Sequence, residues 1–238
     1  MRILITNDDG IRADGIVRLA NVAKEFGEIW VVAPKEQRSA ASHSITLHDS
    51  IDVYPYHDFK VDGVKAFYCS GTPGDCVRVG GLNVMPNRPD VVLSGINYGY
   101  NVASDIQYSA TCGAAFEAAF QGYHAIAFSE GCDCHEVTDK YIRQILGDLL
   151  SIKLEPGFIH NVNFPGCSIS DFKGILYDRT ISRGMFYKDT YDVIENLENE
   201  GIRYMVHGHY NEKCEDESDF RAVVNGYISV GVVNNVGY

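Results

Sequence analysis

The feature that most constrains this chain is a short apolar run that ends abruptly at two carboxylates. Residues 3–6 are apolar or β-branched, and the polar stretch 7–10 follows at once, with Asp8 and Asp9 at its centre. An apolar run bounded by turn residues predicts a buried strand of a parallel sheet. Because ligands of open α/β sheets bind beyond the carboxyl ends of the strands, we expect Asp8 and Asp9 at a functional edge.

Two neighbouring carboxylates at this edge have two interpretations. Like charges repel, and their burial is costly unless a cation offsets them, which favours a site for a hard divalent metal. The alternative is a solvated Asp-Asp turn. The pair alone does not decide between the two interpretations. The choice depends on which other side chains the chain places near the two carboxylates.

Length and composition are typical of an ordinary globular protein. The 238 residues suggest one domain or at most two, with 45% hydrophobic and 22% charged residues. The net charge of −12 argues against binding to nucleic acid duplexes, because the phosphate backbone attracts basic surfaces. A small anionic substrate stays compatible with this charge, since a bound metal reverses the field locally.

Targeting signals and cysteine usage predict a cytoplasmic protein with no membrane partner. No apolar run approaches the roughly 20 residues of a spanning helix, and no secretory leader is recognisable. The seven cysteines fit a reducing compartment. The stretch 132–135 reads Cys-Asp-Cys-His, but no second ligand pair follows at zinc-like spacing, so an ordinary loop is favoured over a soft-metal site.

Strand and helix patterns alternate over roughly the first 165 residues. Strands are expected near 3–6, 29–33, 66–69, 89–97, 125–129 and 159–165, with shorter ones at 45–47 and 51–54; helices are expected near 16–26, 73–82, 112–121 and 137–150. In the second helix of this series, Thr72 is expected to be the N-cap and Leu82 to face the core. The alternation predicts an α/β fold with a doubly wound, mostly parallel sheet.

The regular alternation of strand and helix patterns ends after residue 165. Strands are expected at 175–178, 203–207 and 227–233, a projecting hairpin within 189–211, an acidic solvated stretch at 212–219, and a short helix capped at Ser218. With no linker or repeat in between, we expect a single domain over residues 1–238, made of a core (about 1–165) and a C-terminal extension (about 166–238).

Three polar segments follow the predicted strands and supply partners for the carboxylates. Ser39 lies in the loop after the second strand, and Asn97 ends the third strong strand. Ser109 and Thr111 begin a helix, where hydroxyls and free N–H groups can bind an anion, although helix capping alone is the alternative. Oxygen donors of this kind suit Mg²⁺, Mn²⁺ or Ca²⁺.

Other nucleotide and hydrolase motifs are missing from the sequence. The chain contains neither a Gly-x-Gly-x-x-Gly fingerprint nor a phosphate loop with Gly-Lys-Ser/Thr. It also has no Gly-x-Ser-x-Gly elbow, which weakens a serine hydrolase interpretation.

Taken together, the motifs resemble those of the SurE family of survival-protein phosphatases. The resemblance is carried by residues 7–10, 38–42, 71–76, 94–97 and 108–111, with later blocks at 161–165 and 219–230. It covers nearly the whole chain in order. It implies a Rossmann-like core and hydrolysis of nucleoside 5′- or 3′-monophosphates, and some members of the family also act on short-chain polyphosphate.

The resemblance also implies the site. One divalent metal ion would be held by Asp8, Asp9, Ser39 and Asn97, with Asp8 and Asp9 as the catalytic residues, and the phosphate would be bound by Asn101, Ser109 and Thr111. It further implies a homodimer or a tetramer with exchanged C-terminal elements.

Two departures from the family pattern stand out. Ala110 replaces the usual Gly, which restricts a backbone N–H near the phosphate. The last strand lacks the proline that usually follows Ser229-Val230, and the C-terminal extension looks short, which weakens the expectation of a tetramer. A non-catalytic metal- or nucleotide-binding protein is therefore one alternative. An aspartyl-phosphate phosphatase with Asp8 as nucleophile is another, although position 10 is Gly where such enzymes carry a second Asp.

Overall fold

The protein is built around one sheet in which most neighbouring strands run parallel. The computed structural model describes residues 1–211 and 213–236. In this part of the chain the sheet has the order β3-β4-β2-β1-β5-β6-β7-β11-β8, and its antiparallel pairs are β3 with β4 and β7 with β11. The strands are β1 (Arg2–Thr6), β2 (Glu28–Pro34), β3 (Val53–Pro55), β4 (Lys65–Cys69), β5 (Val91–Tyr98), β6 (His124–Glu130), β7 (Phe158–Phe164), β8 (Gly174–Leu176) and β11 (Tyr227–Asn234). The predicted mostly parallel α/β fold is confirmed.

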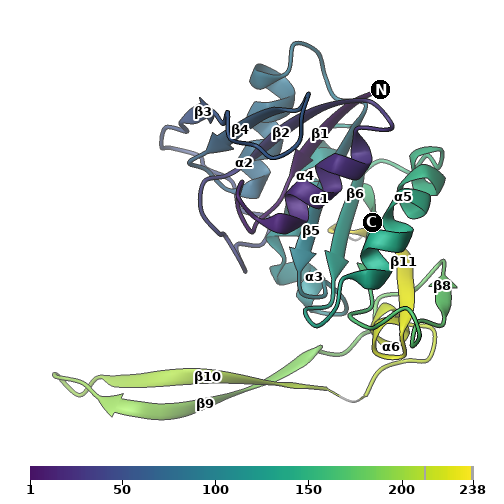
Figure 1. The fold of residues 1–238 in the computed structure, drawn as a ribbon. Helices are drawn as coiled ribbons and strands as arrows, with labels where there is room; N and C mark the ends of the chain where they lie inside the picture. Colours follow the sequence, from purple (N-terminus) through teal and green to yellow (C-terminus); the bar gives the residue numbers. More distant parts are fainter. Residues whose placement is uncertain (212, 237–238) are drawn as a thin grey trace.

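Helices cover both faces of this sheet (Figure 1). They are α1 (Asp14–Ala23), α2 (Pro73–Val79), α3 (Asp105–Tyr108), α4 (Ala110–Phe120), α5 (Glu136–Leu150) and α6 (Asp219–Val224), with a π-helical turn η1 (Gly80–Val84) directly after α2. Ile3 and Ile5 pack in the cluster that contains α1 and α5, whereas Leu4 packs in the cluster that contains α2 and α4. Strand β1 is therefore buried on both faces, which is why its sequence is a continuous apolar run.

The order in which the chain adds strands to the sheet reverses next to β1. The chain leaves β1 through α1 to reach β2 on one side, and it later returns through α2 and η1 to β5 on the other side. Such a switch point leaves a crevice at the carboxyl ends of the two strands, where open α/β sheets bind their ligands. The turn after β1 and the last residues of β5 lie at this crevice, as the sequence predicted.

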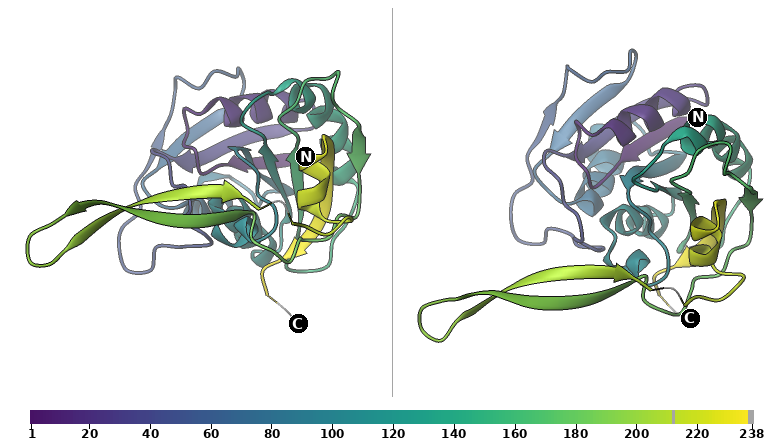
Figure 2. Two further views of the ribbon diagram at one scale, coloured as in Figure 1. Left: turned by 90° about the horizontal axis from the view of Figure 1, so that it is seen from below. Right: turned by 60° about the horizontal axis from the view of Figure 1, so that its bottom comes forward.

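The C-terminal region contributes both to the sheet and to a separate hairpin. Strand β11 pairs with β7 and β8, so the main sheet continues into this region. Strands β9 (Tyr187–Asn196) and β10 (Ile202–Tyr210) form a two-stranded antiparallel hairpin. This hairpin extends far from the body of the molecule in every view (Figures 1 and 2). The predicted projecting hairpin is confirmed.

Two local expectations were wrong. Residues 45–47 do not form a strand; instead, the backbone N–H and hydroxyl of Thr46 donate to the two carboxylate oxygens of Asp75, at 2.9 and 2.7 Å, so a side chain replaces a strand partner. Leu82 does not face the core but is 57% exposed. Helix α2 ends at Val79 and the wider π-helical turn follows, so helical spacing no longer places Leu82 on the buried face.

Predicted caps are confirmed where the local sequence alone determines them. The Thr72 hydroxyl accepts the N–H of Asp75, and the Asp75 carboxylate accepts the N–H of Thr72, which is a complete capping box. The Ser218 hydroxyl caps α6 by accepting the N–H of Arg221, without the reciprocal bond of a capping box. Among the described helices, none combines the length and the apolar character that crossing a membrane requires.

Candidate metal and phosphate site

A rigid turn after β1 presents the two adjacent carboxylates. The Asn7 side chain donates to the carbonyl of Gly10 at 2.9 Å and accepts the N–H of Gly10 at 3.2 Å. Gly10 has a φ of +96°, a conformation that side-chain-bearing residues rarely adopt. The carbonyl of Asp8 accepts the N–H of Arg38 at 2.7 Å, which ties this turn to the loop after β2.

Asp8 is a buried carboxylate with a single side-chain partner in the described structure. It is 3% exposed, and one of its oxygens accepts a short hydrogen bond from the hydroxyl of Thr111. Burial raises the pKa of Asp8 to about 6, the nearby charge of Asp9 adds to this rise, and the bond from Thr111 opposes it. An acid in this environment gains strongly from a cation.

Asp9 connects the turn to two other parts of the site. One carboxylate oxygen accepts the backbone N–H of Tyr98 at 3.2 Å, and the other accepts the side-chain amide of Gln37 at 3.2 Å. The same amide nitrogen donates to the hydroxyl oxygen of Ser39 at 2.9 Å. Gln37 therefore holds Asp9 and Ser39 together, a role that sequence patterns did not indicate. Burial raises the pKa of Asp9 as well.

Asn97 lies at the end of β5, where the pairing with β6 shifts register between Ser94 and Asn97. Its side-chain nitrogen donates to the carbonyl of Gly99 at 2.8 Å, which leaves its amide oxygen as the available metal ligand. Gly95 permits this bend, because a Cβ there would lie 2.3 Å from the carbonyl oxygen of Phe128.

The loop that carries Ser39 is held against helix α4. A Cβ on Gly113 would lie 2.4 Å from the carbonyl oxygen of Ser42, so the absence of a side chain at 113 lets the loop pack directly on the helix. Farther along, the imidazole Nε2 of His43 lies 2.8 Å from a carboxylate oxygen of Glu117. Contacts of this kind cannot be read from the sequence, because they join segments more than 70 residues apart.

Asn101 is fixed by a set of asparagines that sequence reasoning left without a role. Its backbone N–H donates to the side chain of Asn163 at 2.8 Å, and its carbonyl accepts from Asn161 and Asn163 at 2.9 and 3.1 Å. Its own side chain donates to Ser129 at 2.8 Å. The polar residues of β7, embedded in a buried strand, were the signal in the sequence that could have revealed this support.

Ser109 and Thr111 lie close in sequence but have different surroundings. The Ser109 hydroxyl oxygen caps α4 by accepting the N–H of Cys112 at 3.0 Å. Ser109 also borders the cavity described below. Thr111 is completely buried and donates to Asp8, and it does not border that cavity. The structure thus places Thr111 behind the carboxylate.

These residues surround a cavity of about 340 Å³ at the switch point. Its lining consists of Asp8, Ser39, Ala40, Asn97, Tyr98, Asn101, Asp105, Tyr108, Ser109, Met185, Tyr187 and Asp189. Asp9 borders a neighbouring cavity of about 280 Å³, and Tyr98 lies between the two. Predicted ligands from three separate loops therefore meet at one edge of the sheet.

The donor set fits a hard divalent cation. In the described residues, neither Asp8 nor Asp9 forms an ion pair with a basic side chain. Carboxylate, hydroxyl and amide oxygens are the donors that Mg²⁺, Mn²⁺ and Ca²⁺ prefer. The described residues contain no group of three or more His, Cys, Asp or Glu side chains suited to a metal ion, either here or around Cys132, so the hydroxyl of Ser39 and the amide of Asn97 would have to complete the donor set.

A doubly wound sheet with an oxygen-lined cavity at its switch point is typical of α/β proteins that bind a small ligand at this edge. Comparison with known proteins narrows the class. Residues 3–186 match the family model described as "Survival protein SurE", and the chain belongs to the SurE family.

Alignments with related proteins cover nearly the whole chain. A protein of Flavobacterium johnsoniae named 5′-nucleotidase SurE is 36% identical over 234 residues, covering 96% of this chain and 88% of the relative. A protein of the same name from Thermoanaerobacter pseudethanolicus is 38% identical over 236 residues, covering 97% and 90%. The crystal structure of the SurE protein from Aquifex aeolicus has a TM-score of 0.80 at 30% identity and covers 98% of this chain and 93% of that one. The predicted family is confirmed.

Proposed function

We propose that this protein is a divalent-metal-dependent phosphomonoesterase that hydrolyses nucleoside 5′- or 3′-monophosphates. The observation that carries the proposal is the cavity at the switch point, where Asp8, Ser39 and Asn97 meet Asn101 and Ser109. Relatives that are 36% and 38% identical over almost the whole chain are named 5′-nucleotidases, which supports the same activity here.

The proposed cofactor is one divalent ion, Mg²⁺, Mn²⁺ or Ca²⁺, held by Asp8, Asp9, Ser39 and Asn97. When bound, such an ion polarises a phosphoryl oxygen and lowers the pKa of a coordinated water. Asp8 and Asp9 have no basic partner among the described residues, which supports this assignment, because the ion would supply the balancing positive charge.

The chain's own residues orient the reactants in this proposal. Asp8, held by Thr111, is positioned to accept the proton of the attacking water. Ser109 accepts the N–H of Cys112, so its own hydroxyl proton is free to bind a phosphoryl oxygen. The side chain of Asn101 uses one N–H for Ser129 and has a second for the phosphate.

Thr111 has a modified role in this scheme. The sequence resemblance assigned it to the phosphate, but its hydroxyl donates to Asp8 and the residue is completely buried. We therefore assign Thr111 to the orientation of Asp8, with Ser109 and Asn101 as the phosphate contacts.

The activity is tested by phosphate release from a panel of nucleoside 5′- and 3′-monophosphates with Mg²⁺, Mn²⁺ or chelator. We expect release that chelator abolishes and added metal restores. Release that is insensitive to chelator contradicts the metal role. Nucleotide binding without release with any metal points to the non-catalytic alternative, and a trapped phospho-aspartate at Asp8 to the aspartyl-phosphate alternative.

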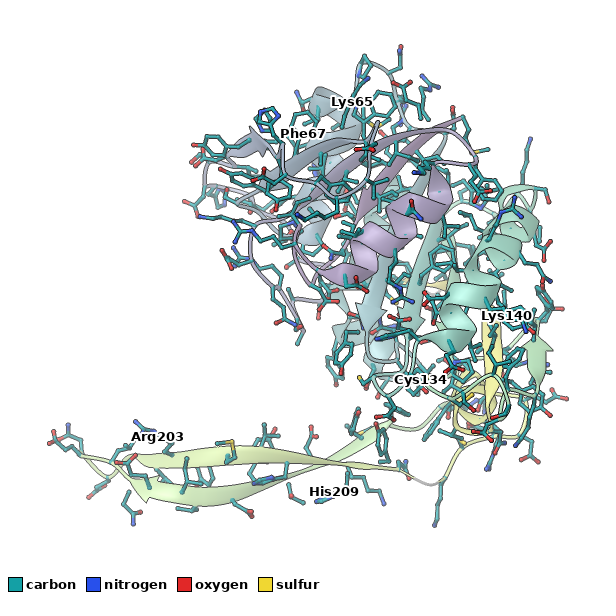
Figure 3. The ribbon with its side chains drawn as sticks, viewed as in Figure 1. Lys65, Phe67, Cys134, Lys140, Arg203 and His209 are labelled. Atoms are coloured by element: carbon teal, nitrogen blue, oxygen red, sulfur yellow. The ribbon has the colours of Figure 1, made fainter. Side chains whose placement is uncertain are left out.

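We also propose a homodimer, or a larger homo-oligomer, assembled through the projecting hairpin. All of β10 and nearly all of β9 are exposed, including large apolar side chains such as Tyr191, Val193, Tyr204 and Val206. Side chains such as those of Arg203 and His209 extend from the hairpin into open space (Figure 3). An isolated two-stranded hairpin is marginally stable in water, so contact with a second copy would stabilise it.

Deletion of the hairpin tests this assembly. Replacing residues 190–207 by a short turn is expected to lower the molar mass measured by light scattering after size-exclusion chromatography, because the contact surface is removed. A full-length protein that is monomeric at micromolar concentration would contradict the proposal.

The remaining elements of the proposal concern location and organisation. All seven cysteines are free, which supports a reducing, cytoplasmic location. We also propose that residues 1–238 act as one domain, since β8 and β11 of the extension join the sheet of the core.

A further inference from the structure

The cavity at the switch point has two dissimilar ends. At the inner end, Asp8, Asn101 and Ser109 are at most 7% exposed. At the outer end, Tyr108 and Met185 are 56% and 49% exposed. Under the proposed function the phosphoryl group occupies the inner end, so the rest of the substrate lies against the outer end.

The outer end is formed by helix α3 and by the base of the hairpin, of which the sequence connected only Tyr108 to the site. Helix α3 supplies Asp105 and Tyr108, which are three residues apart and therefore share a helix face. The base of the hairpin supplies Met185, Tyr187 and Asp189.

The base of the hairpin is anchored, unlike its tip. Phe186 is 1% exposed and packs edge-on against Phe220 and Tyr187, with ring centroids 4.7 and 4.8 Å apart. Tyr187 in turn stacks on Tyr210 at 4.9 Å. This packing holds Met185, Tyr187 and Asp189 in place at the cavity, and residues that determine specificity need such a fixed position.

The charge at the outer end is negative. Asp105 and Asp189 both border the cavity. Burial raises the pKa of Asp105, and the negative charge of Asp189 raises it further. None of the described residues that line the cavity is Lys, Arg or His. A second anionic group at this end would therefore meet two carboxylates and no basic side chain.

This distribution of charge distinguishes between phosphate substrates. When a terminal phosphoryl group occupies the inner end, the next group outward is an uncharged ribose in a nucleoside monophosphate. In a nucleoside diphosphate or in tripolyphosphate it is another anionic phosphoryl group, which carboxylates repel.

We propose that Asp105 and Asp189 are specificity-determining residues that exclude substrates with a second phosphoryl group, while Tyr108 and Tyr187 receive the nucleoside. This inference rests on the proposed phosphomonoesterase function. It predicts that the protein prefers nucleoside monophosphates over the short polyphosphates on which some members of its family act.

The test compares kcat/KM for adenosine monophosphate and for tripolyphosphate at one free Mn²⁺ concentration. The ratio of tripolyphosphate to monophosphate is expected to rise about tenfold in the double variant Asp105→Asn with Asp189→Asn, because removing two charges lowers the repulsion. The control is Asp192→Asn, which removes a charge from the same hairpin at a residue outside the cavity lining.

A second measurement requires no variant. Raising the ionic strength should increase the same ratio in the wild-type protein, because salt screens repulsion between partly exposed charges. A ratio that rises less than threefold in the double variant, or a wild-type protein that hydrolyses tripolyphosphate as well as the monophosphate, overturns the inference. Neither result touches the proposed function, which fails only if the monophosphate itself is not hydrolysed.

Discussion

Replacing Asp8 by Asn is expected to reduce kcat/KM for nucleoside monophosphates by about 10³-fold or more and to weaken Mn²⁺ binding strongly. The substitution removes a charged ligand and the proposed proton acceptor, yet it keeps an oxygen that can accept the hydrogen bond from Thr111. Phosphate release and calorimetric titration with Mn²⁺ measure the two effects. The control is Asp14→Asn, at an exposed carboxylate nearby, which should change activity less than about twofold.

The same variant should be more stable than the wild-type protein in the absence of metal at pH 7. The pKa of Asp8 is about 6 in the folded protein and 3.8 when unperturbed, so the folded state binds more protons between these values. The contribution of Asp8 to the stability of the metal-free wild-type protein is therefore fully present below the lower value and is lost as pH rises through about 6, by roughly 2–3 kcal/mol in all.

Asp8→Asn removes this penalty, so its melting temperature without metal should exceed that of the wild-type protein at pH 7 and approach it near pH 4. Thermal unfolding in chelator at both pH values measures the difference. An inactive variant that is also less stable at pH 7 would show that Asp8 supports the fold rather than the metal, and full turnover by the folded variant would exclude Asp8 from the site.

Replacing Thr111 by Val is the second large effect that we expect, with activity reduced about 10- to 100-fold at neutral pH. Valine has a similar shape, so the buried site stays filled, but the hydroxyl that donates to Asp8 is lost. Because this bond lowers the pKa of Asp8, its removal should raise that pKa and move the acidic limb of the kcat/KM profile to higher pH.

The pH profile separates this role from direct phosphate binding. Thr111→Ser keeps a hydroxyl and should recover most of the activity with an acidic limb close to that of the wild-type protein. If Thr111→Val instead raised KM alone and left the acidic limb unchanged, Thr111 would be a phosphate contact, as the family resemblance first implied.

The sequence was sufficient for those parts of the fold in which local physics dominates. The apolar run 3–6 is buried on both faces, so its composition alone indicated a central parallel strand. Thr72 and Ser218 cap helices through N–H groups three residues away, which is a local interaction. Leu82 and residues 45–47 were predicted wrongly, because a π-helical turn and the Asp75 side chain overrode local patterns there.

For the candidate site, the sequence by itself determined which chemical groups stand at the strand ends. Asp8 and Asp9 follow one buried strand and Asn97 lies at the end of another, and parallel strands bring their carboxyl ends to one edge. Only the tertiary structure decided how these groups are supported. The hydroxyl of Thr111 reaches Asp8 across 103 residues, and Met185 and Tyr187 reach the cavity from a region that looked like an appendage. The reason is physical: alternation and capping act within a few residues of the chain, whereas hydrogen bonds and cavity walls depend on which distant segments pack together.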